Sequence, residues 1–175
     1  MELERATAEL YLRHAFTQML EVADRLGDSS VNERPLGPAE AAALPTAGAG
    51  ARACESDHVP ETNAVAALII HCCGVTEFWI GHVALGRPSY RDRESEFSRT
   101  ANVAELHAMV DATLARVSED VAAIDEGRTQ PDRTGRQFLE GGDESDGAIV
   151  LHVLEELYQH LGHMQIAADA LAVRG

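Results

Sequence analysis

The chain has 175 residues, of which 45% are hydrophobic and 25% charged, and these values fit one globular domain with a core of its own. All 14 basic residues are arginine, and 29 acidic residues bring the net charge to −15. This negative excess argues against nucleic acid and against an anionic membrane surface as partners, because both are bound by basic faces.

The first part of the chain is predicted to form one helix followed by a long loop. Residues 1–5 are acidic and lack the basic-then-apolar order of a signal peptide, so we expect a cytoplasmic protein. Apolar residues recur at helical spacing from Leu3 to Leu26, and Gly27 is a plausible stop. The segment 28–60 is rich in Ala, Gly, Pro and Ser and is predicted to be a loop, with a short helical turn at Ala39–Leu44.

A second helix is predicted from Glu61 to Leu85. Thr62 or Asn63 is expected to cap its N-terminus, and Gly86 is expected to end it. No apolar run, this one included, approaches the length that we expect of a membrane span.

Two more helices are predicted in the second half of the chain. One runs from Val103 to Ile124, with Asn102 or Thr100 as its cap, and the other runs from Ser145 to Val173. The Gly-rich segment 127–143 between them is predicted to be a connection. No strand pattern competes, so the sequence predicts an all-α, four-helix bundle that forms a single domain over residues 1–175.

Histidine and glutamate form the most specific pattern in the sequence. His71 lies inside the apolar run of the second predicted helix, while His152, Glu156 and His160 follow one another at four-residue spacing on the fourth. Residues four apart share one helical face, so Glu156 and His160 can point at the same place, and His71 from a facing helix can supply a third ligand. Two histidines and one carboxylate with an open position are a catalytic zinc ligand set. The alternative is a hydrogen-bonded core histidine and an ordinary solvated Glu–His pair.

Two motifs add a resemblance to a known family. The stretch 63–80, N-A-V-A-A-L-I-I-H-C-C-G-V-T-E-F-W-I, resembles the second helix of the DinB/YfiT-like superfamily. It is most similar to the mycothiol-dependent branch, which includes maleylpyruvate isomerase N-terminal-like domains and mycothiol S-transferases. The stretch 151–163 contains E-x-x-x-H-x-G-H, which resembles the fourth-helix motif of that branch. The resemblance implies that His71, Glu156 and His160 are the metal ligands. The segment 28–60 looks longer than the corresponding loop of the family, and the sequence ends soon after the fourth predicted helix.

Several neighbouring residues have less specific interpretations. His163 and His152 are possible outer-shell or pocket residues, although a surface histidine is the simpler interpretation of each. Trp79 is expected in the core or in a pocket wall. The thiols of the cysteines are expected to be free, with Cys72 a small core residue. Three arginines after the second helix can bind an acidic substrate, but we expect a solvated surface cluster: Arg87, Arg91 and Arg93.

These observations favour an enzyme in which a divalent metal, with zinc as the expected ion, activates a small thiol for attack on an electrophilic small molecule. The resemblance suggests mycothiol as the thiol, and S-transfer or thiol-dependent isomerisation as the reaction. The alternatives are a non-catalytic metal- or ligand-binding stress protein and a metal-dependent hydrolase. The expected partners are small molecules only, and the protein is expected to be a monomer or a homodimer.

Overall fold

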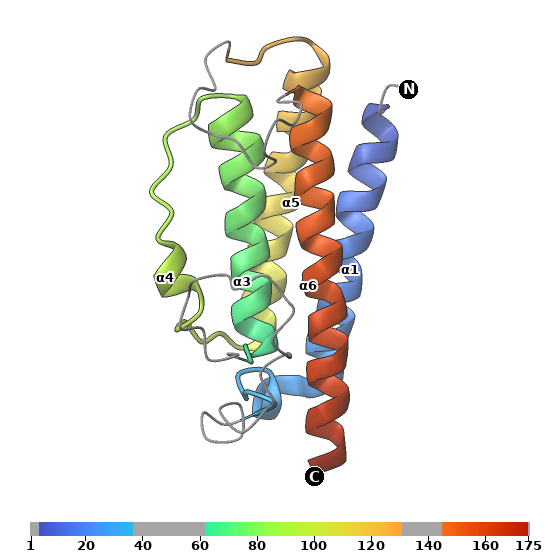
Figure 1. The fold of residues 1–175 in the computed structure, drawn as a ribbon, viewed down its shortest axis with the longest axis vertical. Coiled ribbons are helices and arrows are strands. Elements are labelled where there is room, and N and C mark those ends of the chain that lie inside the picture. The colour runs from blue at the N-terminus through green and yellow to red at the C-terminus, as the bar shows by residue number, and fades with distance from the viewer. Residues whose placement is uncertain (1–3, 37–61, 131–144, 175) are drawn as a thin grey trace, which may run out of the picture.

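The computed structural model describes residues 4–36, 62–130 and 145–174, and in this part of the chain it contains helices and no strand. Its long helical segments lie side by side (Figure 1): α1 (Arg5–Ser30), α3 (Val65–Thr76) continued by the π-helical η1 (Glu77–Ala84), α5 (Val103–Asp125) and α6 (Asp146–Arg174). The prediction of an all-α, four-helix bundle is therefore confirmed. A short helix, α4 (Arg93–Glu96), lies beside α3 on the side away from α6 (Figure 1).

Gly27 interrupts α1 but does not end the helical segment. Its φ of 65° and ψ of 177° are non-helical, yet helical residues continue to Ser30. Glycine adopts a positive φ without the steric cost that a β-carbon brings. The predicted stop thus lies where the helix breaks, and the segment extends three residues further because the amide of Val31 bonds back to the Gly27 carbonyl oxygen.

The start of α3 differs from the prediction. Ala64 occupies the N-cap position without a side-chain cap hydrogen bond. Thr62 is not the cap because its hydroxyl is used elsewhere: it donates to the carbonyl oxygen of Leu36 at 2.8 Å and accepts from the Leu36 amide at 3.2 Å. At the other end, Gly86 follows η1 with a φ of 73°, as the prediction of a glycine stop requires.

The N-terminus of α5 is closed by a capping box, as the choice of Asn102 predicts. The Asn102 side chain accepts from the amide of Glu105 at 2.9 Å, and the Glu105 carboxylate accepts from the Asn102 amide at 2.8 Å. This reciprocal pair satisfies two backbone groups and fixes the start of α5.

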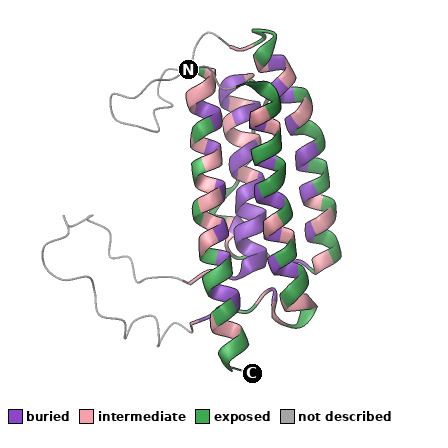
Figure 2. Cartoon of the chain, turned by 90° about the vertical axis from the view of Figure 1, so that its right-hand side faces the viewer, coloured by how far each residue is buried: buried purple, intermediate pink, exposed green. Residues whose placement is uncertain are grey.

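The core lies between the four long helices, whose inward faces are buried in Figure 2. The segment Val65–Ala84 is central to it, with 20 residues and a mean hydropathy of 1.4. By length and composition this segment could cross a membrane, so the expectation that no run approaches that length is wrong. Because 72% of its apolar window is buried in the bundle, its hydropathy is that of a core helix.

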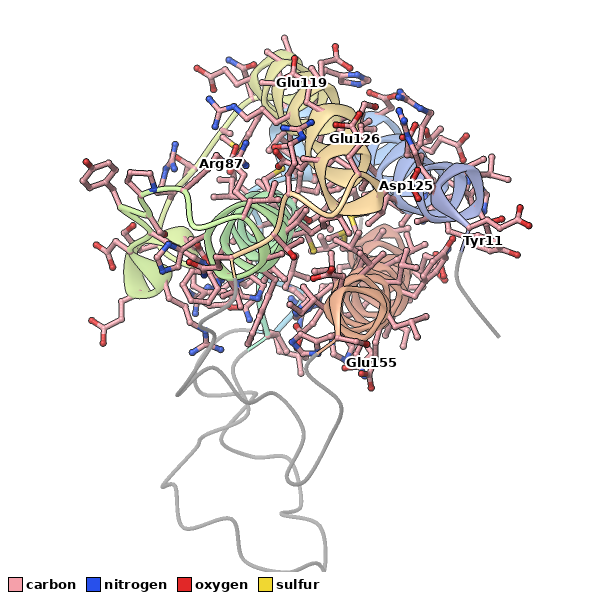
Figure 3. All side chains as sticks on the ribbon, turned by 90° about the horizontal axis from the view of Figure 1, so that it is seen from above. Tyr11, Arg87, Glu119, Asp125, Glu126 and Glu155 are labelled. Atoms are coloured by element: carbon pink, nitrogen blue, oxygen red, sulfur yellow. The ribbon has the colours of Figure 1, made fainter. Side chains whose placement is uncertain are left out.

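Apart from buried Glu96 and Asp120, the acidic side chains of the described residues are at least partly exposed. In the view along the helices, Glu119 of α5 and Glu155 of α6 point away from the space between them (Figure 3). The net charge is thus carried by solvated faces.

Some predictions fall on parts of the chain that the structure does not describe. The helical turn at Ala39–Leu44, most of the loop 28–60 and most of the connection 127–143 lie outside the described residues.

Candidate metal centre

His71 is a buried polar residue in the middle of the most apolar helix of the bundle. Its side chain is 4% exposed, and its ring packs 4.7 Å from the ring of Phe97 between centroids. Its Nδ1 atom lies 2.7 Å from Oε2 of Glu96, which comes from α4. The Nδ1 atom of His71 therefore faces a carboxylate, and the Nε2 atom on the other side of the ring is the one that can bind a further partner.

Glu156 and His160 come from one face of α6, as their four-residue spacing predicts. The Nε2 atom of His160 lies 3.4 Å from Oε2 of Glu156. Both side chains are partly exposed, at 33% for Glu156 and 18% for His160, so a small molecule from solvent can reach them.

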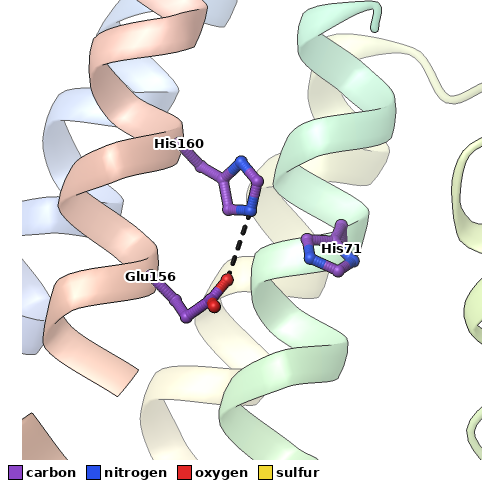
Figure 4. A group of neighbouring side chains, drawn as sticks. All are labelled: His71, Glu156 and His160. Atoms are coloured by element: carbon purple, nitrogen blue, oxygen red, sulfur yellow. Dashed lines mark ion pairs between the residues drawn. The ribbon is translucent and has the colours of Figure 1, made fainter. Parts of the chain in front are cut away.

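The bundle brings these two residues to His71, because α3 and α6 pack against each other. Figure 4 shows the three side chains converging on one space between the two helices. One ligand atom from each lies within 4.8 Å of the other two. The rings of His71 and His160 are 4.9 Å apart between centroids and nearly perpendicular, at 85°. The sequence prediction that these three residues share a site agrees with this geometry.

The protonation states suit metal ligands. Burial lowers the pKa of His71, and this effect outweighs the opposing interaction with Glu96. Burial also lowers the pKa of His160, and nearby His71 lowers it further. Both imidazoles are therefore favoured in the neutral form, which has a lone pair to offer a cation.

The donor set fits a divalent metal ion. In a tetrahedral site with metal–ligand distances near 2.0–2.1 Å, donor atoms are about 3.3 Å apart. The Glu156–His160 separation of 3.4 Å already has this value, whereas the farthest pair, within 4.8 Å, has to close slightly. In addition, the Nδ1 atom of His160 is buried and has no hydrogen-bond partner among the described residues, so its ring is held by the contact with Glu156 and by packing against the rings of His71 and His163.

The other histidines of the pattern lie outside this group. His163 is exposed, with its ring 5.8 Å from that of His160 between centroids. His152 stacks edge-on against Trp79, with 4.9 Å between the centroids, and Trp79 packs against the core, in agreement with its predicted place.

The cysteines next to His71 are core residues and point elsewhere. Cys72 and Cys73 are free and buried. Burial raises the pKa of the Cys72 thiol well above its ordinary value, and it raises the pKa of Cys73 to about 12 against the weaker effect of a hydrogen bond with Thr113. Neither thiol is poised to be a nucleophile or a ligand.

The prediction of a solvated arginine cluster is wrong for two of its three members. Arg87 forms a bidentate pair with buried Asp120, at 2.7 and 2.6 Å, and Arg91 donates to Glu96 at 2.7 and 2.9 Å. Only Arg93 is exposed, with its guanidinium over the ring of Phe97. Arg87 and Arg91 pair with the buried carboxylates of Asp120 and Glu96, because a buried charge is costly without a partner.

Sequence reasoning missed Glu96, the buried carboxylate beside His71. Its helix has only four residues, too few to show a periodic pattern, and nothing in a separation of 25 residues indicates contact with His71. The one local signal is Asp92 followed by Ser95, a cap that marks a helix start: the Asp92 side chain accepts from the Ser95 amide.

An apolar cavity lies about one helical turn from the three converging side chains, none of which lines it. Its volume is about 340 Å³, and it is bordered by Leu68, one turn before His71, and by His163, one turn after His160. Pro35 and Leu36 close it from the other side. The cavity can hold the apolar part of a small molecule.

The fold and this constellation define an all-α protein with a two-histidine, one-glutamate candidate metal centre between α3 and α6. The sequence profile of the DinB superfamily matches residues 7–164, and the chain therefore belongs to that superfamily. No curated protein and no solved structure matches the chain. The family match includes both ligand-bearing helices and establishes the superfamily level of the resemblance.

Proposed function

We propose that this protein is a metal-dependent thiol transferase or thiol-dependent isomerase that acts on an electrophilic small molecule. The observation that carries the proposal is the convergence of two neutral imidazoles and one carboxylate at a partly exposed place, one helical turn from an apolar cavity. We further propose zinc as the metal and mycothiol as the thiol, the latter on the resemblance of the two helix motifs.

A divalent ion in this centre would supply the positive charge that lowers the pKa of a thiol and so raises its nucleophilicity. His71, Glu156 and His160 are the residues that would hold it. The walls of the cavity, Leu68 and Leu36 among them, exclude water from the apolar part of the substrate.

The reaction needs no nucleophile from the protein. The sulfur of the small thiol forms the new S–C bond, its proton passes to solvent, and in a transfer the leaving group departs with the bonding electron pair. In an isomerisation the S–C bond forms and later breaks, which regenerates the thiol. The high pKa values of Cys72 and Cys73 support an external thiol as the nucleophile.

The first test is metal content in protein purified without a His tag. Replacing His71, Glu156 or His160 by alanine should remove most of the bound metal while the helical circular dichroism stays, because each change deletes a ligand at the edge of the core. His107→Ala is the matched control, since His107 makes a histidine–carboxylate contact with Asp24 at 2.8 Å, on α5 and α1. Full metal content in His160→Ala would contradict the assignment.

The second test is turnover. Metal-free protein should be inactive towards an activated aryl chloride, and activity should return with zinc and require added thiol, mycothiol above other thiols. Turnover with water as the only cosubstrate would indicate a metal-dependent hydrolase. Bound metal without turnover across a panel of thiols and electrophiles would favour a non-catalytic metal- or ligand-binding protein.

A further inference from the structure

We propose that Glu96, held in place by Arg91, is a positioning residue that sets the orientation and tautomer of His71, so that Nε2 is the nitrogen offered to the metal. The inference deepens the proposed function, because it concerns the same centre, and it assigns a role to a carboxylate that is not itself a ligand.

The hydrogen bonds determine where the proton of His71 lies. Glu96 Oε2 is 2.7 Å from His71 Nδ1, and the same carboxylate accepts two bonds from the Arg91 guanidinium. Arg91 Nη2 also lies 3.3 Å from His71 Nδ1, but this contact is longer than the one with Glu96 and would need Nδ1 to be unprotonated. The Glu96 oxygens already accept from Arg91, so in the 2.7 Å contact the carboxylate is assigned as the acceptor and Nδ1 as the donor. Nδ1 is therefore the N–H nitrogen, and Nε2 has the free lone pair.

Burial makes this arrangement hard to replace. The Glu96 side chain is 7% exposed and that of Arg91 15%. An imidazole nitrogen that loses its carboxylate acceptor has only water as a replacement, from the cavity of about 820 Å³ that Gly74, Arg91 and Glu96 line. Metal-ligating histidines in proteins commonly donate their second nitrogen in this way, and removal of the acceptor typically costs about 10- to 100-fold in metal affinity.

Gly74 provides the space for the carboxylate. It lies on α3 one turn after His71, and a β-carbon at this position would collide with Oε1 of Glu96. Because Glu96 is tied to both Arg91 and His71, it cannot move aside without loss of one of these bonds. A single methyl group on α3 is thus expected to displace the carboxylate without any change of charge.

His160 provides the contrast within the same centre. Its Nδ1 atom is buried without a hydrogen-bond partner, whereas Nδ1 of His71 has one. Among the described residues, Nδ1 is thus hydrogen-bonded in His71 but not in His160, whose Nε2 atom contacts Glu156 instead. The two histidines should therefore differ in tautomer even when no metal is bound.

The experiment uses the full chain, metal-free and zinc-loaded, with nitrogen-15-labelled histidine. In the metal-free wild type, long-range ¹⁵N–¹H spectra should show His71 as a single Nδ1–H tautomer. Glu96→Ala should give a mixture of tautomers and a zinc affinity about 10- to 100-fold lower in a chelator competition. Glu96→Gln, whose amide oxygen can still accept, should retain most of the Nδ1–H tautomer and lose less affinity. Gly74→Ala should resemble Glu96→Ala.

Asp120→Asn is the matched control. Asp120 is as buried as Glu96, at 5% exposed each, and it also forms a two-bond pair with an arginine, but it does not touch a proposed ligand. Its replacement should leave the His71 tautomer and the zinc affinity unchanged, which separates positioning from general destabilisation.

The results that would overturn the proposal are distinct from those that would overturn the metal centre. An unchanged His71 tautomer in both Glu96→Ala and Gly74→Ala would refute the role of Glu96, as would an equal loss of zinc affinity in Asp120→Asn. A wild-type protein that binds no metal would refute the proposed function, while its metal-free spectra would still test the tautomer. If Glu96→Ala does not fold, Glu96→Gln and Gly74→Ala give the same answer.

Discussion

The thiol of Cys73, two residues after His71 on α3, should not react with alkylating reagents in the native protein. Its side chain is buried against Thr113, and burial raises the pKa of its thiol to about 12, from an ordinary 9.0. The prediction matters for function, because a reactive thiol next to His71 would offer a nucleophile of the protein's own.

The magnitude follows from the two pKa values. At pH 8 the thiolate fraction is about 10⁻⁴ for a pKa of about 12 and about 10⁻¹ for 9.0, so alkylation of the native thiol should be roughly 1,000-fold slower. The same shift makes folding sensitive to alkali. Below pH 9 both states keep the proton and stability is complete, whereas from pH 9 towards 12 the unfolded state loses the proton first and stability falls. At pH 10 the loss from this thiol should be about 1 kcal/mol relative to pH 8.

The assay compares Cys54→Ser with Cys54→Ser/Cys73→Ala, so that the thiols under test are those on α3. Iodoacetamide labelling at pH 8 should be negligible before guanidinium is added and rapid after it. Urea unfolding at pH 8 and pH 10 should show a steeper loss of stability in the variant that keeps Cys73, since all other groups cancel in the difference. Labelling of native Cys73 at the rate of a free thiol, or an identical alkaline loss in both proteins, would refute the reasoning.

Two further predictions test neighbours of the centre and the frame that holds it. His163→Ala should retain its metal with at most a modest change in affinity, because the ring of His163 lies beside His160 and outside the converging group; complete loss of metal on elemental analysis would mean that the wrong histidine was chosen. Asn102→Ala should lower the free energy of unfolding by about 1 kcal/mol, measured by urea titration, because it removes the capping box of α5; an unchanged midpoint would show that this cap contributes nothing.

Local periodicity was enough to predict the helices and the shared face of Glu156 and His160. A four-residue separation on an uninterrupted helix always returns to one side, so this pair required no tertiary information. Asn102 was predictable as a cap for the same reason, because its partner, Glu105, lies three residues away. Where the partner is distant the prediction fails: Thr62 looks like a cap, but its hydroxyl bonds to Leu36, which is 26 residues away.

The rest of the site depends on contacts that spacing does not encode. Arg87 was expected to be solvated, but it crosses η1 at Gly81, where a β-carbon would collide with its guanidinium, and reaches Asp120 on α5. The position of His71 opposite Glu156 was supported by family resemblance rather than by periodicity, because an isolated histidine on an apolar helix has no partner in its own sequence neighbourhood. The close approach at Gly81 is visible only once the helices are packed.

The position of the centre in the bundle indicates that the helices fold before a metal ion binds. Ile69 and Leu157, which lie near the ligands along α3 and α6, are fully buried, so the packing of these two helices is supplied by apolar contacts. Glu156 and His160 lie at the partly exposed edge of that contact, whereas His71 is buried within it. Small zinc domains fold only with their ion because they lack such a core, whereas this chain has one that apolar side chains of the long helices supply. Metal binding should therefore add to the stability of an already folded bundle, and the exposed edge leaves the centre open to a small molecule.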